Sequence, residues 1–158
     1  MSKAPGFDLP ATAGKSYSVS GLKPGDLAVV AFFKATCPTC MLAMPFVDKL
    51  FRSHQGDRGV RIFSVAQEPE REANDFAKRY DLKLPVALDQ DPYRVSTQYG
   101  LTNVPTIVVV TPDGMIERTI VGFVKREYEA LARRIAQAVN KAAVDLFAGV
   151  SVPELKPG

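Results

Sequence analysis

The chain has 158 residues, of which 23% are charged and 46% hydrophobic, and its formal net charge is +3. This composition is typical of one soluble globular domain, so we expect a single domain over residues 1–158, with a core at about 7–147 and an irregular tail at 148–158. The basic residues are dispersed among acidic ones, which argues against nucleic acid or a membrane surface as a partner. The longest apolar runs, Leu27 to Phe33 and Ile107 to Val110, are too short to span a bilayer.

The N-terminus and the cysteine content bear on the cellular location. Residues Met1 to Pro10 contain no apolar segment of the kind found in a secretion signal. This favours a cytoplasmic location, with a periplasmic or exported one as the alternative if a leader has been removed. Two cysteines spaced as Cys-x-x-Cys are few for a disulfide-stabilised secreted scaffold. The pair is therefore interpreted as redox-active or metal-binding rather than structural.

The hydrophobic pattern predicts strands and helices in alternation along the chain. Alternating residues around a Gly-Lys turn predict a short hairpin within residues 7–26, laid on the edge of a sheet. Beyond it, apolar runs predict buried strands, and apolar residues at helical spacing predict helices between them. In chain order, these elements are a strand at 27–34, a helix from 40 that ends near 54–59, a strand at 60–66, a helix opening at 68–70, a strand at 84–88, a short helix within 91–99, two strands at 107–111 and 115–121 joined by a turn, and a long helix from 125 to about 147.

Both cysteines lie where the strand at 27–34 runs into a helix, in the sequence Cys37-Pro38-Thr39-Cys40. A helix N-terminus leaves backbone N–H groups unpaired and carries a partial positive charge, so a thiolate placed there is stabilised. Cys37 is therefore predicted to be the nucleophile, and Pro38 suits the first helical position. Cys40 follows one turn later, within reach of Cys37, so the pair can close reversibly into a disulfide.

Several short motifs accompany this order of elements. They are Phe7-Asp8-Leu9-Pro10, Gly14-Lys15, Ala31-Phe32-Phe33, Met44-Pro45, Tyr99-Gly100-Leu101, Val104-Pro105-Thr106, Pro112-Asp113-Gly114 and Gly122. Together they resemble the TlpA/ResA group of thioredoxin-like thiol-disulfide oxidoreductases, which borders the AhpC/TSA peroxiredoxins. The resemblance covers roughly residues 7–135. It implies an α/β thioredoxin-like fold, with a central mixed β-sheet flanked by helices, an N-terminal β-hairpin and a long C-terminal helix.

The resemblance also implies a function and a set of site residues. Cys37 and Cys40 would exchange electrons with protein disulfide or dithiol partners and with an upstream thiol reductant or oxidant, without a bound cofactor. Pro105 would be a cis-proline facing the active site, and the backbone of Val104 would pair with a bound polypeptide. The predicted substrate-binding residues are therefore Pro38, Thr39, Val104 and Pro105.

Two acidic residues of the family pattern are missing. Thioredoxins carry an acid six residues before the nucleophile, where this chain has Ala31, and ResA-like proteins carry a Glu three residues after the second cysteine, where it has Ala43. Glu68 and Lys34 are the nearest charged candidates to replace them, but both are predicted to be solvated surface charges. The dipeptide between the cysteines matches no well-known redox class, so the direction of electron flow stays open.

Other functions remain as alternatives. A peroxiredoxin-like thiol peroxidase is the strongest, although Val30 and Lys34 stand where peroxiredoxins carry a Pro and a Thr. A zinc site needs about four ligands, but His54 is the only histidine, and it is predicted to lie at the surface. Copper could bind the two thiolates, but the motif alone does not select for it. A non-catalytic binding module would predict that the thiols do not exchange. We therefore expect no metal.

Overall fold

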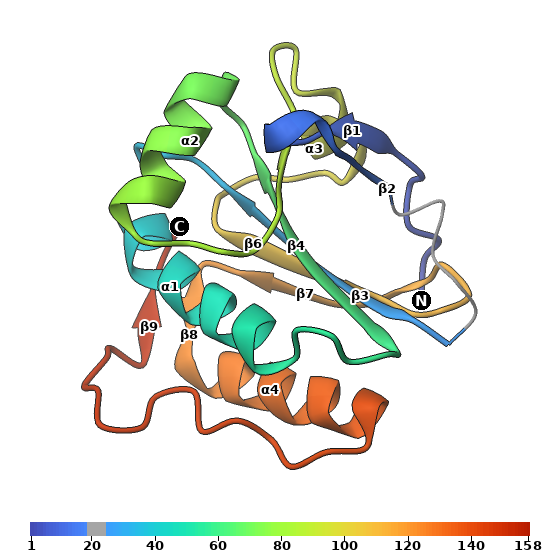
Figure 1. Cartoon of the computed structure of the whole chain (residues 1–158), viewed down its shortest axis with the longest axis vertical. Coiled ribbons are helices and arrows are strands. Elements are labelled where there is room, and N and C mark those ends of the chain that lie inside the picture. The colour runs from blue at the N-terminus through green and yellow to red at the C-terminus, as the bar shows by residue number, and fades with distance from the viewer. Residues whose placement is uncertain (19–24) are drawn as a thin grey trace.

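The computed structural model describes residues 1–18 and 25–158. Its centre is a five-stranded sheet in the order β5-β4-β3-β6-β7 (Figure 1). The strands are β3 (Leu27–Phe33), β4 (Val60–Ala66), β5 (Val86–Leu88), β6 (Thr106–Val110) and β7 (Ile116–Val121). The first three run parallel, β6 is antiparallel to β3, and β7 is antiparallel to β6. The predicted mixed sheet is thus confirmed.

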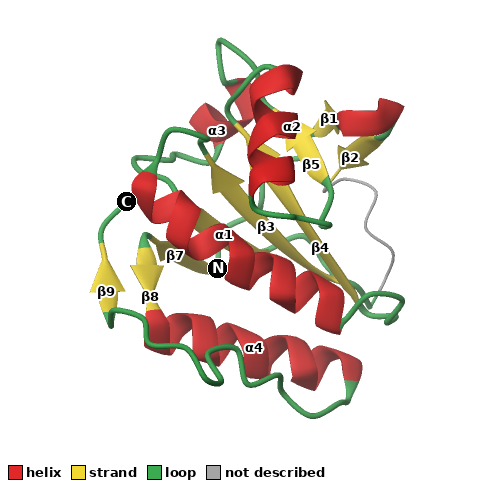
Figure 2. Cartoon of the chain, turned by 60° about the vertical axis from the view of Figure 1, so that its left-hand side comes forward, coloured by secondary structure: helices red, strands yellow, loops and turns green. Residues whose placement is uncertain are grey.

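Helices cover both faces of this sheet. They are α1 (Pro38–Ser53), α2 (Glu70–Arg79), α3 (Arg94–Gln98) and α4 (Lys125–Val139). Buried residues of α1, α2 and α4 pack on one face with Phe33 and Ile107, whereas Val95 of α3 packs on the other face with Phe32. Figure 2 shows α1 and α4 side by side in front of the sheet. Every residue of β3 is buried, because a central strand covered on both faces has no solvent side.

The N-terminal hairpin lies on the edge of the sheet, as the sequence predicts. Its strands β1 (Asp8–Pro10) and β2 (Ser16–Ser18) pair antiparallel around a short 3-10 turn. Ala11 then bridges to Ala87 of the edge strand β5. The predicted hairpin included Val19 and Ser20, which lie outside the described residues.

The C-terminal part of the chain differs from the sequence prediction. Helix α4 ends at Val139 rather than near Phe147, because Asn140 adopts a left-handed conformation with a φ of 56° and ends the helix. Phe147 is nonetheless buried, with its ring 4.7 Å from that of Phe46 on α1. The apolar spacing that extended the predicted helix therefore comes from an irregular segment that folds back onto the core.

The tail beyond that segment is also more ordered than predicted. Its strand β9 (Leu155–Lys156) pairs antiparallel with β8 (Phe123–Val124), a short strand that leads from β7 into α4. Lys125 at the start of α4 donates its backbone N–H to the carbonyl of Glu154 at 3.0 Å. The tail is therefore fixed to β8 and to the start of α4.

His54, predicted at the surface, is buried with 6% of its area exposed. It is the residue after α1, and its backbone N–H bonds back to the last turn of that helix. Its Nδ1 lies 3.1 Å from Asp57 Oδ2, and Asp57 Oδ1 accepts a bond from Lys141 Nζ at 2.5 Å. The prediction failed because the polar sequence neighbours of His54 do not reveal its contact with Asp57, which in turn is bound by Lys141 from a distant part of the chain.

Candidate redox site

The two cysteines lie at the junction of β3 and α1. Cys37 is the N-cap residue of α1, and Pro38 is its first residue, as the sequence predicts. The Sγ atom of Cys37 accepts a hydrogen bond from the backbone N–H of Cys40 at 3.2 Å. That N–H belongs to the first turn and has no partner within the helix, so the cysteine sulfur takes the place of the usual capping oxygen.

A second segment, distant in sequence, faces Cys37. The Val104–Pro105 peptide bond is cis, as the family resemblance implies, and it immediately precedes β6. The Cys37 thiol donates a hydrogen bond to the Val104 carbonyl, with 3.3 Å between sulfur and oxygen. The antiparallel pairing of β6 with β3 accounts for this contact, because the start of β6 lies beside the end of β3. The structure thus brings Cys37, Cys40, Val104 and Pro105 together.

The two thiols have different surroundings. Cys37 is partly exposed, whereas Cys40 has no exposed area and belongs to the apolar core between α1 and the sheet. Burial raises the pKa of the Cys40 thiol far above its usual value, and the hydrogen bond with Cys37 and the Glu68 carboxylate raise it further. The accessible sulfur is therefore the one at the helix start, and Cys40 stays a neutral thiol behind it.

Glu68 was predicted to be a solvated surface charge, and this prediction is wrong. Its side chain is half-buried, and Oε1 accepts a hydrogen bond from the backbone N–H of Ala35 at 2.5 Å. The sheet pairing explains the position of Glu68. Gln67 donates its backbone N–H to the Phe33 carbonyl at 3.1 Å, which continues the β3–β4 pairing past the strand ends. Glu68 is thus brought to the loop that carries the cysteines.

Tyr128, on α4, is a further residue near the dithiol that the sequence analysis did not select. It is fully buried, and its hydroxyl has no hydrogen-bond partner among the residues that the structure describes. Burial raises the pKa of Tyr128, and the charge of an ionised Cys40 would raise it further. Helical spacing from Leu131 could have indicated that Tyr128 points inward, but not that it lies near Cys40.

Two of the predicted substrate-binding residues lie in the first turn of α1. Pro38 is exposed beside Cys37. Thr39 is only 4% exposed, and its hydroxyl donates a hydrogen bond to the carbonyl of Pro157 at 2.7 Å. The hydroxyl of Thr39 is therefore already bonded to the tail of the chain.

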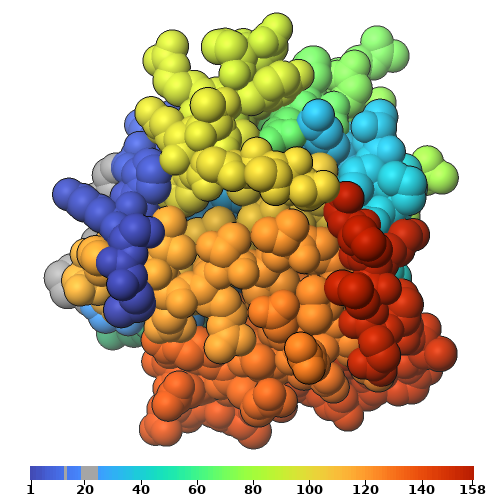
Figure 3. All heavy atoms as spheres, turned by 180° about the vertical axis from the view of Figure 1, so that it is seen from behind, coloured from blue at the N-terminus to red at the C-terminus, as the bar shows by residue number. Residues whose placement is uncertain are grey.

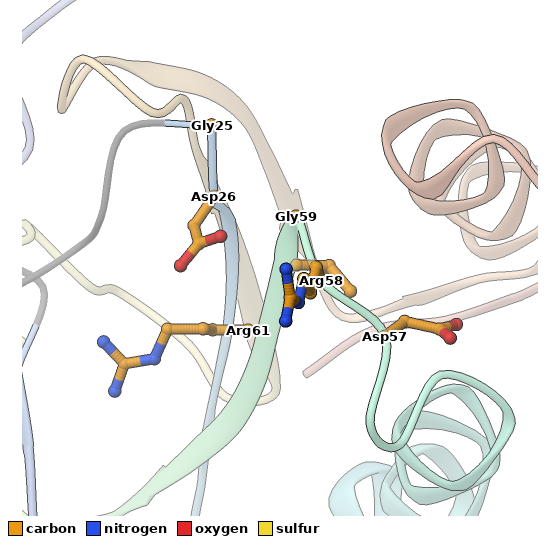
Figure 4. Close-up of a pocket in the computed structure, with 7 residues that line it drawn as sticks. Gly25, Asp26, Asp57, Arg58, Gly59 and Arg61 are labelled. Atoms are coloured by element: carbon orange, nitrogen blue, oxygen red, sulfur yellow. The ribbon is translucent and has the colours of Figure 1, made fainter.

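A cavity of about 380 Å³ opens beside the motif. Its lining residues are Lys34, Gln67, Leu101, Thr102, Asn103, Val104 and Gly158. A larger cavity, of about 660 Å³, lies at the other end of β3 and β4, where Asp57 points away from Asp26 and Arg61 (Figure 4). Because it borders the start of these strands, it is remote from the cysteines. Within the described part of the chain, no three His, Cys, Asp or Glu residues gather as a metal site.

The burial of Cys40 predicts a pH dependence of stability for the reduced protein. The folded state keeps Cys40 neutral, whereas the unfolded state ionises it near pH 8.5 to 9, so stability should fall as the pH rises above that value. The expected loss approaches about 1.4 kcal/mol per pH unit. Urea unfolding from pH 7 to 10.5, under a phosphine reductant, measures this loss against Cys40→Ala, which keeps the buried Tyr128. Parallel curves for the two proteins would contradict the assignment.

Comparison with known proteins agrees with this geometry. The family model described as Redoxin matches residues 1–138. The thiol-disulfide oxidoreductase ResA of a Bacillus cereus strain is 31% identical over 121 residues, covering 76% of this chain and 68% of that protein. A Chlorobium tepidum structure designated as thiol:disulfide interchange protein DsbE is 24% identical with a TM-score of 0.76, covering 87% of this chain and 96% of that chain.

A further solved structure shows the same fold. The thioredoxin domain of thiol-disulfide oxidoreductase BVU-2223 from Bacteroides vulgatus is 22% identical with a TM-score of 0.73, covering 88% of this chain and 96% of that chain. The fold and site thus define a thioredoxin-like oxidoreductase. The chain belongs to the Redoxin family, and within it to the thiol-disulfide oxidoreductases of the TlpA/ResA type. None of the helices among the described residues is long and apolar enough to cross a membrane.

Proposed function

We propose that Cys37 and Cys40 form the redox centre through which this protein exchanges disulfides with protein or small-thiol partners. One observation carries the proposal most: a partly exposed sulfur at a helix start contacts the backbone of its buried partner thiol and the carbonyl before a cis-proline. An attacking thiol must be reachable, and a resolving thiol must be close and protected. Cys37 meets the requirement for the attacking thiol, and Cys40 meets that for the resolving thiol.

The reaction has two exchange steps. The thiolate of Cys37 attacks one sulfur of a partner disulfide, so that a mixed disulfide forms and the other partner sulfur leaves as a thiolate that takes up a proton. Cys40 then loses its proton and attacks the sulfur of Cys37, which releases the second partner thiol. The dithiol is oxidised by two electrons, and the partner disulfide is reduced. An upstream thiol reductant restores the dithiol, and an upstream oxidant would drive the cycle in reverse.

The second step requires an acceptor for the proton of a buried thiol. At the two positions where related proteins carry an acidic residue, this chain has Ala31 and Ala43. Glu68 is half-buried at the motif loop, and its charge acts on Cys40. Glu68 is therefore our candidate for the acceptor, and it would raise the share of Cys40 thiolate once its carboxylate takes up the proton.

The proposal extends to partner binding and context. The carbonyl of Val104, next to Pro105, contacts Cys37, and Pro38 is exposed directly after Cys37 in the chain, which suits these residues to contact a bound polypeptide. We propose that residues 1–158 act as one domain, since both apolar clusters pack against the same sheet. We also propose that the exchange takes place without a bound cofactor. The cytoplasmic location favoured by the N-terminal sequence stays a prediction, with periplasmic or exported as the alternative.

Substrate comparison tests the proposed function. With dithiothreitol as reductant, the protein should accelerate insulin reduction, and the rate should depend on Cys37. Hydrogen peroxide should be consumed no more than about tenfold faster than by a free thiol, because Val30 and Lys34 replace the residues that shape a peroxide pocket in peroxiredoxins. Rapid, saturable peroxide turnover with a sulfenic acid at Cys37 would instead place the protein among the thiol peroxidases.

A further inference from the structure

The tail of the chain runs directly to the redox site. From β9 it continues beside the sheet to residue 158, between the start of α1 and the loop that precedes β6. Figure 3 shows this segment in red as a ridge whose upper end lies between the cyan of α1 and the yellow of the segment around residue 100. Residues 155–158, called here the C-terminal strap, are fixed at one end by the β8–β9 pairing.

Two side chains that flank Cys37 hold the other end of the C-terminal strap. Thr39, in the first turn of α1, donates its hydroxyl to the Pro157 carbonyl at 2.7 Å. Asn103, in the loop before the cis-proline, donates Nδ2 to the Gly158 carbonyl at 3.2 Å. The strap thus connects the two segments between which a partner must reach Cys37.

The C-terminal strap lies against the backbone of Val104 and of Gly122. A Cβ atom at Gly158 would collide with the carbonyl oxygen of Val104. A Cβ atom at Gly122 would lie 2.9 Å from the Lys156 carbonyl and 3.1 Å from the Gly158 nitrogen. Only residues without a side chain permit this approach. The carbonyl of Val104 that meets Gly158 is the same one that accepts the hydrogen bond from Cys37.

We infer that the C-terminal strap is a specificity-determining segment, because Gly158 packs against the Val104 carbonyl, in the space that a polypeptide bound at Val104 would need. This inference rests on the proposed disulfide exchange. A polypeptide disulfide must displace the strap before its sulfur meets Cys37. A small disulfide need not, because Cys37 is partly exposed and the cavity bordered by Lys34 and Gln67 is open beside it. The strap therefore lowers the rate with polypeptides relative to small disulfides.

Kinetics with two substrates test this inference. A variant lacking residues 151–158 should reduce insulin about tenfold faster than the full chain, the effect expected when two hydrogen bonds no longer oppose binding. Its rate with oxidised glutathione should stay within about twofold of the full chain. Asn103→Ala should raise the insulin rate about threefold, since it removes one of these bonds. The matched control Asn74→Ala, at an exposed asparagine on α2, should change neither rate.

The outcomes separate failure of the inference from failure of the proposed function. If the full chain reduces oxidised glutathione through Cys37 but the folded shortened variant shows the same insulin-to-glutathione ratio, the strap does not control specificity. If the shortened variant does not unfold cooperatively, Asn103→Ala decides, and an insulin-to-glutathione ratio equal to that of Asn74→Ala overturns the inference. If neither substrate reacts with any variant, the proposed function itself is wrong.

Hydrogen exchange gives a second measurement, whose result should not change if the C-terminal strap has only a structural role. In the mixed disulfide of Cys40→Ser with a peptide from insulin, the backbone amides of Leu155, Lys156 and Gly158 should exchange at least about tenfold faster than in the free variant. The mixed disulfide with glutathione should leave their protection unchanged. Equal protection in all three states would show that polypeptides bind without moving the strap.

Discussion

Cys37→Ser is expected to abolish disulfide reduction, lowering the rate at least about 10³-fold. The reason is that a thiolate is the attacking species, and no other sulfur in the described site is exposed to a partner. The fold should be unaffected, since serine can still accept the N–H of Cys40 at the start of α1. The insulin assay and a urea unfolding curve measure the two properties.

Cys40→Ser is the matched control, because it removes the resolving thiol and leaves the nucleophile. Cys37 should then accumulate as mixed disulfides when the variant is expressed in cells, and Cys37→Ser should accumulate none. Mass spectrometry of non-reduced samples identifies the cysteine involved. Equal trapping by the two variants, or alkylation of Cys40 before Cys37 at neutral pH, would reverse the assigned roles.

Asp48→Ala is expected to lower the free energy of unfolding by about 3 kcal/mol. Asp48 lies on α1 with 3% of its area exposed, and Oδ1 accepts the backbone N–H groups of Lys83 at 2.7 Å and Leu84 at 2.8 Å. Its Oδ2 accepts Nε of Arg52 at 2.6 Å. Removing the carboxylate leaves two N–H groups without their acceptor in the segment that leads into β5, and unpaired buried donors are costly.

Urea denaturation of the reduced protein measures this loss. Asp81→Ala is a suitable control, because Asp81 also contacts Arg52 but its side chain is 74% exposed, so its effect should be small. Insulin reduction by folded Asp48→Ala should match the wild type, since the hydrogen bonds of Asp48 go to Arg52, Lys83 and Leu84 and to neither cysteine. Equal unfolding midpoints for Asp48→Ala and the wild type would show that the carboxylate is not needed.

The sequence predicted the elements that local patterns determine. The observed β4 has the predicted bounds, and α1 begins at Pro38, because a buried apolar run and a helix-starting proline each act over a few residues. The cis bond before Pro105 was accessible only through family resemblance, since a proline alone is usually preceded by a trans bond. These features were enough to locate the dithiol and the loop that faces it.

Features that depend on long-range contacts were not predicted. His54 was predicted to be exposed because the sequence does not show that Lys141, distant along the chain, holds the Asp57 partner of its imidazole. Glu68 was predicted to be solvated because its partner is a backbone N–H in the loop after β3. The C-terminal strap has a polar, proline-containing sequence that is typical of an irregular tail. Its order comes from pairing with β8 and from bonds to Thr39 and Asn103, none of which is encoded locally.

Equilibrium titration in glutathione redox buffers, followed by alkylation and mass spectrometry, tests the proposed redox centre most directly. The wild type should convert between a dithiol and an intramolecular Cys37–Cys40 disulfide in one two-electron transition, and neither single-serine variant should show it. The midpoint would also give the direction of electron flow for a known compartment. A protein whose two cysteines stay thiols over the whole range, or form only glutathione adducts, would contradict a Cys37–Cys40 redox centre.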